Sequence, residues 1–179
     1  EYSLLPGSTD SRFRRERRGA KGRTQEIERL VARSLRAAVD LEELGPIALN
    51  VDCDILNADG GTRCASITAA NLALRLGVRR LIAAGICLPK NMRPTEEQRR
   101  SGWSPPALSE EEQMAHEMRV MEHDVAAISV GLIDGNSYLD LDYNLESNAD
   151  VDMNGVKVSN GAFVEVQGTG EESTYQRQE

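Results

Sequence analysis

The sequence is poor in the residues on which several common kinds of site depend. Its three cysteines are an odd number and include no Cys-x-x-Cys pair, so neither a disulfide framework nor a zinc site is indicated. The only two histidines, His116 and His123, do not support a Ser/His/Asp triad, and a solvated charged face is their expected setting. Neither a Gly-x-x-x-x-Gly-Lys-Ser/Thr loop nor a Gly-x-Gly-x-x-Gly fingerprint occurs, which argues against the commonest nucleotide-binding motifs.

Long apolar runs are also missing. No stretch approaches the roughly 18 residues that a membrane-spanning helix needs, and no charged-then-apolar leader opens the chain. A length of 179 residues with 40% hydrophobic residues predicts one domain with a buried core, which we expect in the cytoplasm and without a membrane partner. Because the chain begins without Met and ends in a polar tail, we interpret 1–179 as a single incomplete domain.

Acidic residues predominate, but the charge is unevenly distributed. The net charge is −8, yet residues 12–36 contain ten basic and three acidic residues and so carry +7, which leaves −15 for the rest. A basic arm on an acidic body is typical of proteins that bind an anionic polymer. A solvated basic helix face would give the same pattern, and the charge count alone does not distinguish the two.

A glycine-containing stretch stands where the sequence pattern changes. Alternating apolar and polar residues predict a strand over 47–55, and an Ala/Leu-rich pattern predicts a helix over 65–76. Between them lies Asn57-Ala58-Asp59-Gly60-Gly61-Thr62-Arg63. Adjacent glycines before a helix let a ligand approach the free N–H groups of its first turn, and Arg63 adds positive charge, so this loop is a candidate oxyanion site. A tight turn in which Thr62 caps the helix is the alternative.

Another amphipathic helix is predicted upstream of that loop. Apolar residues recur at helical spacing over 27–38, and Thr24 can cap the helix. Arg23, immediately before the cap, would reach an anion held near the helix start. We expect residues 1–23 to form a loop or arm without regular structure, and we expect the helix over 65–76 to end at Gly77.

Residues 86–123 differ in amino-acid composition from the rest of the chain. We interpret them as an atypical, charged and proline-rich insertion. They contain four of the six prolines and the only tryptophan. A capping box formed by Ser109 and Glu112 predicts a helix over about 110–123. Three methionines at helical spacing along it are expected to pack against the body. They are Met114, Met118 and Met121.

The C-terminal third has the pattern of antiparallel strands. An apolar strand is predicted over 125–133, followed by a hairpin turn, a return strand over 137–143, and two further strands over 151–158 and 162–167. The order of helix, strand, helix and then antiparallel strands indicates an α+β fold with a mixed sheet packed against helices.

Carboxylates gather in the same third of the chain. The return strand would place Asp140 and Asp142 on one side of the sheet, and Glu146, Asp150 and Asp152 follow. Crowded carboxylates bind a hard cation such as Mg²⁺ or supply a general acid, although acidic strand edges are more often simply solvated. An oxyanion loop beside a Mg²⁺ site is what phosphoryl transfer requires, because charge develops on several oxygens at once.

Several motifs together cover most of the chain outside residues 86–123. They are Glu1-Tyr2-Ser3-Leu4-Leu5-Pro6, Gly22-Arg23-Thr24-Gln25-Glu26-Ile27, Asp52-Cys53-Asp54, Ala58-Asp59-Gly60-Gly61-Thr62-Arg63, Ser129-Val130-Gly131, Asp140-Leu141-Asp142-Tyr143, Asp150-Val151-Asp152-Met153-Asn154 and Glu165-Val166-Gln167-Gly168-Thr169. In their order and mutual spacing, these motifs closely resemble the ribonuclease PH family.

The resemblance implies a ribonuclease PH-like βαβα fold. It further implies a phosphate-dependent 3′-to-5′ exoribonuclease, or tRNA nucleotidyltransferase, that trims tRNA precursors with inorganic phosphate as co-substrate and releases nucleoside diphosphates. The implied partners are RNA and further copies of the chain, in a ring-shaped hexamer built as a trimer of dimers. The family also has N-terminal strands and a C-terminal helix that this chain lacks.

The resemblance assigns roles to three sets of residues. Arg23, Gly61, Thr62 and Arg63 would bind phosphate. Asp140 and Glu146 would be catalytic, either as ligands of Mg²⁺ or as the acid for the leaving 3′ oxygen. The RNA-binding set would be Arg12, Arg14, Arg15, Arg17 and Arg18.

Glu146 stands where the family has Asp. The additional methylene moves the carboxylate by roughly 1 Å, which is enough to disturb an octahedral Mg²⁺ site. An alternative function is therefore a catalytically weak RNA-binding or ring-building subunit of an exosome-like assembly.

Overall fold

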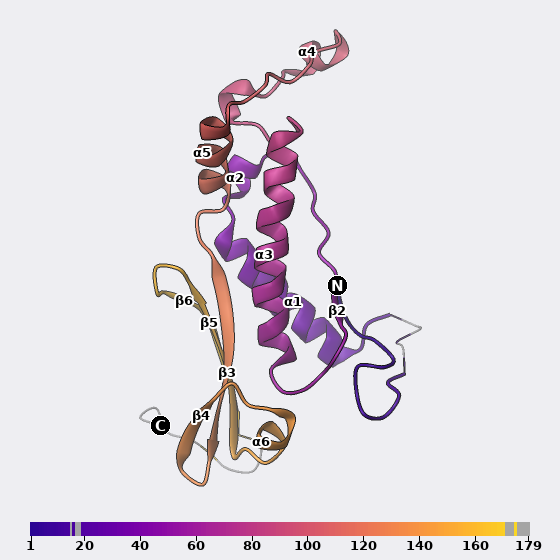
Figure 1. Ribbon diagram of the computed structural model, residues 1–179, viewed down its shortest axis with the longest axis vertical. Coiled ribbons are helices and arrows are strands. Elements are labelled where there is room, and N and C mark those ends of the chain that lie inside the picture. The colour runs from indigo at the N-terminus through magenta and orange to yellow at the C-terminus, as the bar shows by residue number, and fades with distance from the viewer. Residues whose placement is uncertain (15, 17–18, 171–173, 175–179) are drawn as a thin grey trace.

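A computed structural model of the chain describes residues 1–14, 16, 19–170 and 174. Figure 1 shows two long helices, α1 (Gly22–Ala38) and α3 (Thr62–Ala83), beside a sheet that contains the long strand β3 (Val125–Ile133). The other elements, in chain order, are β1 (Tyr2–Leu4), α2 (Leu41–Leu44), β2 (Cys53–Ile55), η1 (Lys90–Met92), α4 (Glu96–Arg100), α5 (Glu110–Val120), β4 (Asn136–Leu139), α6 (Tyr143–Ser147), β5 (Val151–Val158) and β6 (Phe163–Gly170). This arrangement confirms the predicted α+β class.

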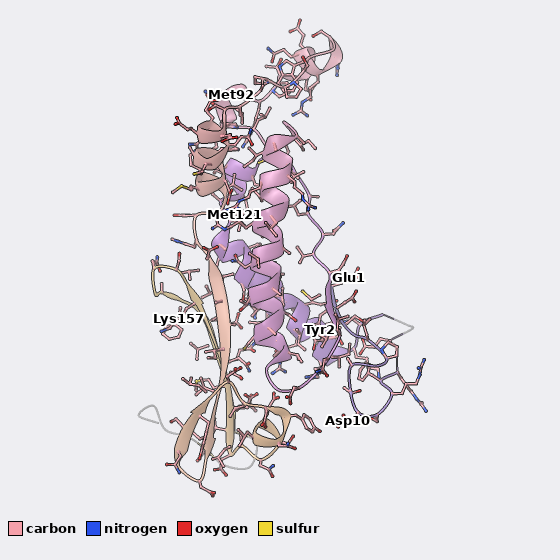
Figure 2. The ribbon with its side chains drawn as sticks, viewed as in Figure 1. Glu1, Tyr2, Asp10, Met92, Met121 and Lys157 are labelled. Carbon is pink, nitrogen blue, oxygen red and sulfur yellow. The ribbon has the colours of Figure 1, made fainter. Side chains whose placement is uncertain are left out.

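The main sheet is antiparallel and has the strand order β4-β3-β5-β6. Strands β3 and β5 have the bounds predicted from the sequence, and their register runs from the pair Val125–Val158 to the pair Leu132–Val151. Alternate residues belong to opposite faces of the sheet. Val156 lies in the core, whereas its neighbour Lys157 places its ammonium 4.3 Å from the centre of the Phe163 ring, on the side away from α3 (Figure 2).

The hydrophobic core lies between the two long helices and the sheet. Its fully buried members include Ile27 and Leu30 of α1, Ile67 and Val78 of α3, and Val156 of β5. Burying each such side chain contributes roughly 1.5–3 kcal/mol. The core therefore fixes the angle between the starts of α1 and α3, which is where the candidate site lies. None of the helices in the described part of the chain is long and apolar enough to cross a membrane.

The strand predicted over 47–55 is wrong for most of its length. Only β2, Cys53–Ile55, pairs as a strand, and its partner is the parallel strand β1 at the chain start, where no regular structure was expected. An alternating pattern of apolar and polar residues shows which side chains can face a core. A strand, however, is hydrogen-bonded only as far as the neighbouring strand extends. The three residues of β1 provide no further partner for residues 47–52.

Both long helices extend beyond their predicted bounds. Helix α1 begins at Gly22 with Lys21 as N-cap, so Thr24 lies within its first turn and donates its hydroxyl hydrogen bond to Glu16. Helix α3 continues through Gly77 to Ala83 because Val78 and Ile82 keep the apolar stripe buried in the core. A glycine in a helix costs only about 1 kcal/mol, and the packing of this face outweighs it.

The return strand is shorter than predicted. Strand β4 ends at Leu139, Asp140 adopts a left-handed conformation with φ 57°, and the unpredicted helix α6 begins after its N-cap Asp142. The carboxylate of Asp142 accepts the backbone N–H of Leu145 at 2.8 Å. Aspartate is a favoured N-cap because its carboxylate accepts the backbone N–H of the residue three positions later. Here this local preference outweighs the alternating strand pattern. Asp140 and Asp142 therefore do not share one face of a strand.

Helix α5 confirms the predicted capping box at Ser109, although the helix ends at Val120. The expected packing of the methionine stripe is wrong for two of its members, because Met114 is 63% and Met118 67% exposed. The helix instead directs His116 and Val120 into the interior. His116 is completely buried, which corrects its expected solvated setting. Among the described residues, no group of three His, Cys, Asp or Glu side chains is placed to hold a metal ion.

Candidate functional site

The loop before α3 is held from two sides. The backbone N–H of Ala58 donates to the carbonyl of Ser8 at 2.6 Å, and the Asp59 carboxylate accepts the backbone N–H of Tyr143 at 2.7 Å. Gly60 packs so closely on residues 141–142 that a Cβ there would lie 1.9 Å from the Leu141 carbonyl oxygen. Only glycine permits this approach, which joins the loop to the segment that leads into α6.

Gly61 is the N-cap of α3 and has a left-handed backbone, with φ 69°. No side chain caps the helix, so the alternative interpretation of Thr62 as the cap is wrong. Thr62 is instead the first helical residue, and its hydroxyl lies 2.9 Å from the hydroxyl of the buried Tyr2. The first-turn N–H groups and the positive end of a 22-residue helix are thus available to an anion.

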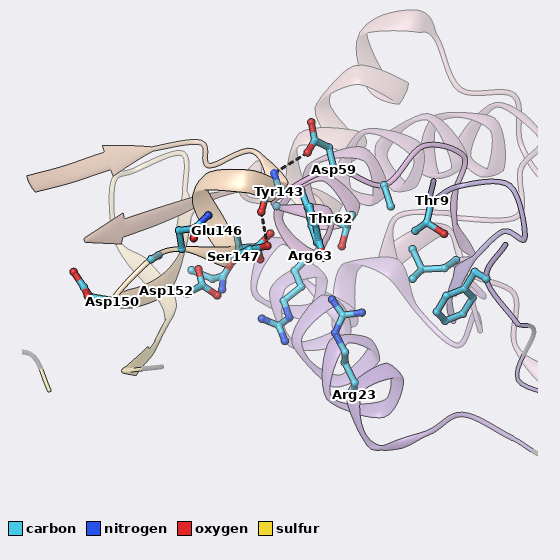
Figure 3. Close-up of a pocket in the computed structure, with 17 residues that line it drawn as sticks. Thr9, Arg23, Asp59, Thr62, Arg63, Tyr143, Glu146, Ser147, Asp150 and Asp152 are labelled. Atoms are coloured by element: carbon cyan, nitrogen blue, oxygen red, sulfur yellow. Dashed lines mark hydrogen bonds between the residues drawn. The ribbon is translucent and has the colours of Figure 1, made fainter. Parts of the chain in front are cut away.

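Two arginines from different helices meet beside this helix start. Arg63 comes from the first turn of α3 and Arg23 from the first turn of α1, and Figure 3 shows their guanidinium groups close to one another. Arg63 donates to Glu26 at 3.0 Å, but its Nε is buried and has no hydrogen-bond partner in the described part of the protein. A buried donor without a partner costs about 1–3 kcal/mol, so an anion that accepted from it would be bound favourably.

Carboxylates face the arginines across the site. Glu146 projects from α6 and Asp152 from β5, and Figure 3 places both on one side of Arg63. Burial raises the pKa of Glu146 above its ordinary value, and the negative charge of Asp152 raises it further. A hydrogen bond with the backbone N–H of Gly61 and the charges of the two arginines oppose this rise. Glu146 therefore holds a proton more readily than a fully solvated glutamate does.

These groups line a cavity of about 740 Å³. Of the residues predicted to bind phosphate or to act in catalysis, the cavity contains Arg23, Gly61, Thr62, Arg63 and Glu146. Asp140 is not among the lining residues but is exposed, and the turn after β4 holds it through the hydrogen bond from its N–H to the Ser129 carbonyl. The cavity does contain Asp152, for which the sequence predicts no role beyond that of a further carboxylate. Asp152 and Asn154 are two residues apart on β5, so their side chains lie on the same face of the sheet, and both line the cavity. This spacing is the sequence signal that could have indicated a role for Asp152.

A buried cysteine lies behind the cavity. Cys64 of α3 donates to the side-chain oxygen of Asn154 at 3.2 Å. Burial and the nearby carboxylates, Asp152 first among them, raise the pKa of this thiol to about 11. A thiol that stays protonated at neutral pH is a poor nucleophile, so Cys64 has a packing role here.

The predicted RNA-binding arginines do not line the cavity where they can be described. Arg12 and Arg14 are exposed, whereas Phe13 between them is half-buried and lines the cavity. Arg15, Arg17 and Arg18 lie outside the described residues.

The arrangement suits chemistry on an anion beside a hard cation. Two guanidinium groups and a helix start provide one side, and Glu146 with Asp152 provides the other. Because their mutual repulsion raises the pKa of Glu146, a divalent cation between these carboxylates would relieve an unfavourable interaction. Mg²⁺ is commonly held by one or two carboxylates together with substrate phosphates, so Glu146 and Asp152 fit it.

Comparison with known proteins identifies both halves of the chain. Residues 1–77 match domain 1 of the 3′ exoribonuclease family, and residues 123–179 match domain 2. Ribonuclease PH of Rhodopirellula baltica is 49% identical over 176 residues, which cover 98% of this chain and 62% of that protein. Ribonuclease PH of Corynebacterium glutamicum is 46% identical over 179 residues, covering 99% of this chain and 61% of that protein. The chain thus spans about three fifths of the length of the curated relatives it matches.

Solved structures with the same fold have much more distant sequences. The Archaeoglobus fulgidus exosome with RNA bound to the active site aligns with a TM-score of 0.59 at 17% identity, covering 99% of this chain and 61% of that one. An archaeal exosome core aligns with a TM-score of 0.53 at 18% identity, covering 87% of this chain and 55% of that one. The chain therefore shares its fold with these two proteins although fewer than one residue in five is identical.

Proposed function

The chain belongs to the 3′ exoribonuclease family that includes ribonuclease PH, and on that basis we propose that its protein is a phosphate-dependent 3′-to-5′ exoribonuclease. Its substrate would be the 3′ end of tRNA precursors, and its product nucleoside diphosphates. The observation that carries this proposal is the convergence of Arg23, Arg63 and the start of α3 in one cavity with Glu146 and Asp152.

In the proposed reaction, inorganic phosphate is the nucleophile. One of its oxygens attacks the phosphorus of the last phosphodiester bond, and the bond to the 3′ oxygen of the preceding nucleotide breaks. The terminal nucleotide leaves as a diphosphate, and the shortened RNA takes up a proton on its new 3′ hydroxyl. Arg23, Arg63 and the first-turn N–H groups would hold the phosphate and stabilise the negative charge that grows on the transferred group.

Glu146 is suited to supply that proton. Burial and Asp152 raise the pKa of Glu146, and a general acid works best when its pKa approaches the working pH. In the alternative role, Glu146 would be ionised and would hold Mg²⁺ together with Asp152, and the ion would neutralise charge at the phosphates. Asp140, the other ligand that the family resemblance implies, lies outside the cavity lining.

The resemblance to the family extends the proposal to partners. RNA would reach the cavity along the arm that carries Arg12 and Arg14, with Arg15, Arg17 and Arg18 as further phosphate contacts. We further propose assembly as a hexameric ring of three dimers, and work in the cytoplasm, where a reducing environment suits three free cysteines.

The phosphate site is tested by the KM for inorganic phosphate during degradation of an RNA with a tRNA-like 3′ end. Arg63→Gln removes a charged donor, which is worth about 1.5–3 kcal/mol, so we expect the KM to rise roughly 10- to 100-fold. Arg29→Gln is the matched control, because Arg29 is exposed on α1 and does not line the cavity. An unchanged KM in Arg63→Gln would remove Arg63 from the phosphate site.

Glu146 also favours a second candidate, the catalytically weak RNA-binding or ring-building subunit. The family has Asp at this position, and the longer side chain reaches far enough to interact with the N–H of Gly61, which the phosphate would otherwise use. Glu146→Asp distinguishes the candidates. A large gain in rate with a lower KM for phosphate indicates an impaired subunit, whereas little change indicates an enzyme adapted to Glu.

A further inference from the structure

Thr62, the first residue of α3, has a hydrogen-bond partner far away in sequence. Its hydroxyl oxygen lies 2.9 Å from the phenolic oxygen of Tyr2 on β1. Tyr2 is 4% exposed and belongs to the hydrophobic core, and Figure 2 shows it beside α3. Thr62, in contrast, lines the cavity. This hydrogen bond therefore joins the interior of the protein to the wall of the candidate site.

The position of Tyr2 is fixed by contacts that do not involve Thr62. Strand β1 pairs in parallel with β2, where Tyr2 lies opposite Cys53. The backbone N–H of Tyr2 donates to the carboxylate of Glu28 on α1 at 3.3 Å. A strand, a helix and the core thus hold the residue, so its hydroxyl is a fixed point from which the side chain of Thr62 can be oriented.

The surroundings of the two hydroxyls determine which of them donates. Each hydroxyl has a single proton, and the distance alone allows either direction. If Thr62 donated, the proton of Tyr2 would need another acceptor in the core, and this hydroxyl makes no further hydrogen bond among the residues that the structure describes. If Tyr2 donates, the proton left free is that of Thr62, which faces a cavity with polar walls. Because a buried donor without an acceptor is unfavourable, Tyr2 is the donor.

Donation by Tyr2 prepares Thr62 to bind an anion. In a helix, threonine divides between two side-chain conformations, and the bond from Tyr2 selects the one whose oxygen lies towards β1. A hydroxyl that accepts a hydrogen bond also becomes a stronger donor through its own proton. Thr62 then donates beside Arg63 and the free N–H groups of the first turn of α3. Such a group of donors suits a ligand whose oxygens accept hydrogen bonds.

We propose that Tyr2 is a positioning residue for the phosphate of the proposed reaction. Its phenolic O–H donates to Thr62, so that the hydroxyl of Thr62 donates to a phosphate oxygen. Tyr2 does not itself line the cavity that contains Thr62, so it acts only through that residue. The identity of the ligand as inorganic phosphate rests on the proposed function.

The test measures the Kd for inorganic phosphate by calorimetry, with the full-length protein and without RNA, so that no turnover takes place. Tyr2→Phe removes only the hydroxyl, and the loss of one hydrogen bond is expected to weaken phosphate binding roughly 2- to 12-fold. Thr62→Ser keeps a hydroxyl and should keep the wild-type Kd. Tyr138→Phe is the matched control, because Tyr138 lies on β4 and does not line the cavity.

A second pair of variants separates positioning from a general structural effect. In a Thr62→Val background, Tyr2→Phe should leave the Kd for phosphate unchanged, because no hydroxyl remains to be oriented. In a Thr62→Ser background, the same substitution should weaken binding by the same factor as in wild type. During RNA degradation, Tyr2→Phe should raise the KM for phosphate by this factor and leave kcat at saturating phosphate unchanged, because the interaction concerns binding alone.

Either of two results would overturn the proposal. One is an unchanged Kd for phosphate in Tyr2→Phe, and the other is an equal loss of affinity with and without the hydroxyl of Thr62. A wild-type protein that binds no phosphate would overturn it as well. The proposed function fails in a different way, through RNA degradation that is indifferent to phosphate while the Kd still responds to Tyr2→Phe.

Discussion

Gly60→Ala is expected to lower the proposed phosphorolytic activity sharply, although Gly60 supplies none of the groups assigned a role in the reaction. The added Cβ would lie 1.9 Å from the Leu141 carbonyl oxygen and 2.7 Å from the carbonyl carbon of Asp142. Both are backbone atoms, so no side chain can rotate away, and a Cβ needs at least 3.0 Å. The loop and the segment before α6 must therefore separate by about 1.1 Å.

That separation acts directly on the site, because the loop leads into Gly61 and Arg63 while the displaced segment leads into Glu146. A misplacement of about 1 Å between reacting groups costs roughly 100-fold in rate. We accordingly expect kcat/KM for phosphorolysis to fall about 100-fold, and the free energy of unfolding to fall by about 1–3 kcal/mol, as for other overpacked sites.

The assay compares initial rates of phosphate-dependent RNA degradation, at a temperature where thermal melts show each variant folded. Gly77→Ala is the matched control. Gly77 lies within α3, and a Cβ added there would meet no atom within 4 Å, so alanine should stabilise the protein by about 0.5–1 kcal/mol and leave the rate unchanged. A folded Gly60→Ala variant with the wild-type rate would show that this contact does not set the distance across the site.

Further predictions concern charge. Glu117 is 6% exposed and accepts from Arg75 and Arg79, so Glu117→Gln should lower the free energy of unfolding by roughly 3 kcal/mol in urea melts; a loss below about 0.5 kcal/mol would contradict a buried pairing. The pKa of Glu146 is raised in the folded state, so its contribution to stability is full at low pH and lost as pH rises through that pKa. Glu146→Gln should therefore gain stability over wild type as the pH rises above the ordinary glutamate pKa of 4.5, and a pH-independent difference would count against the burial argument. Neutralising both Arg12 and Arg14 should reduce the slope of log Kd for single-stranded RNA against log salt by about 1.4, and an unchanged slope would show that neither contacts a phosphate.

Elements with one buried face or strong local signals could be predicted from the sequence. Strand β3 has its predicted bounds because a continuous apolar run is bordered by turn residues on one side and by the polar end of a helix on the other. The capping box at Ser109 likewise depends only on residues three apart. Residues 47–52 show the limit of such reasoning, because the alternation there is clear but the pairing partner is set by chain far away in sequence.

The same distinction applies to the site. The loop at Gly60 and Gly61 could be located from its glycines and the change of periodicity around it. Its partners could be assigned only through the family resemblance, because the meeting of Arg23 and Arg63 depends on the angle at which two helices pack. The position of Asp140 could not be predicted, since helix capping by Asp142 ends the strand that would have carried it.

In the proposed reaction, inorganic phosphate, and not water, attacks the RNA. Incubation of the full-length protein with RNA and isotopically labelled phosphate tests it most directly, because phosphorolysis transfers the labelled phosphorus into the product. We predict labelled nucleoside diphosphates and no release of nucleotides when phosphate is omitted. Unlabelled nucleoside monophosphates, released equally with and without phosphate, would show that water and not phosphate is the nucleophile.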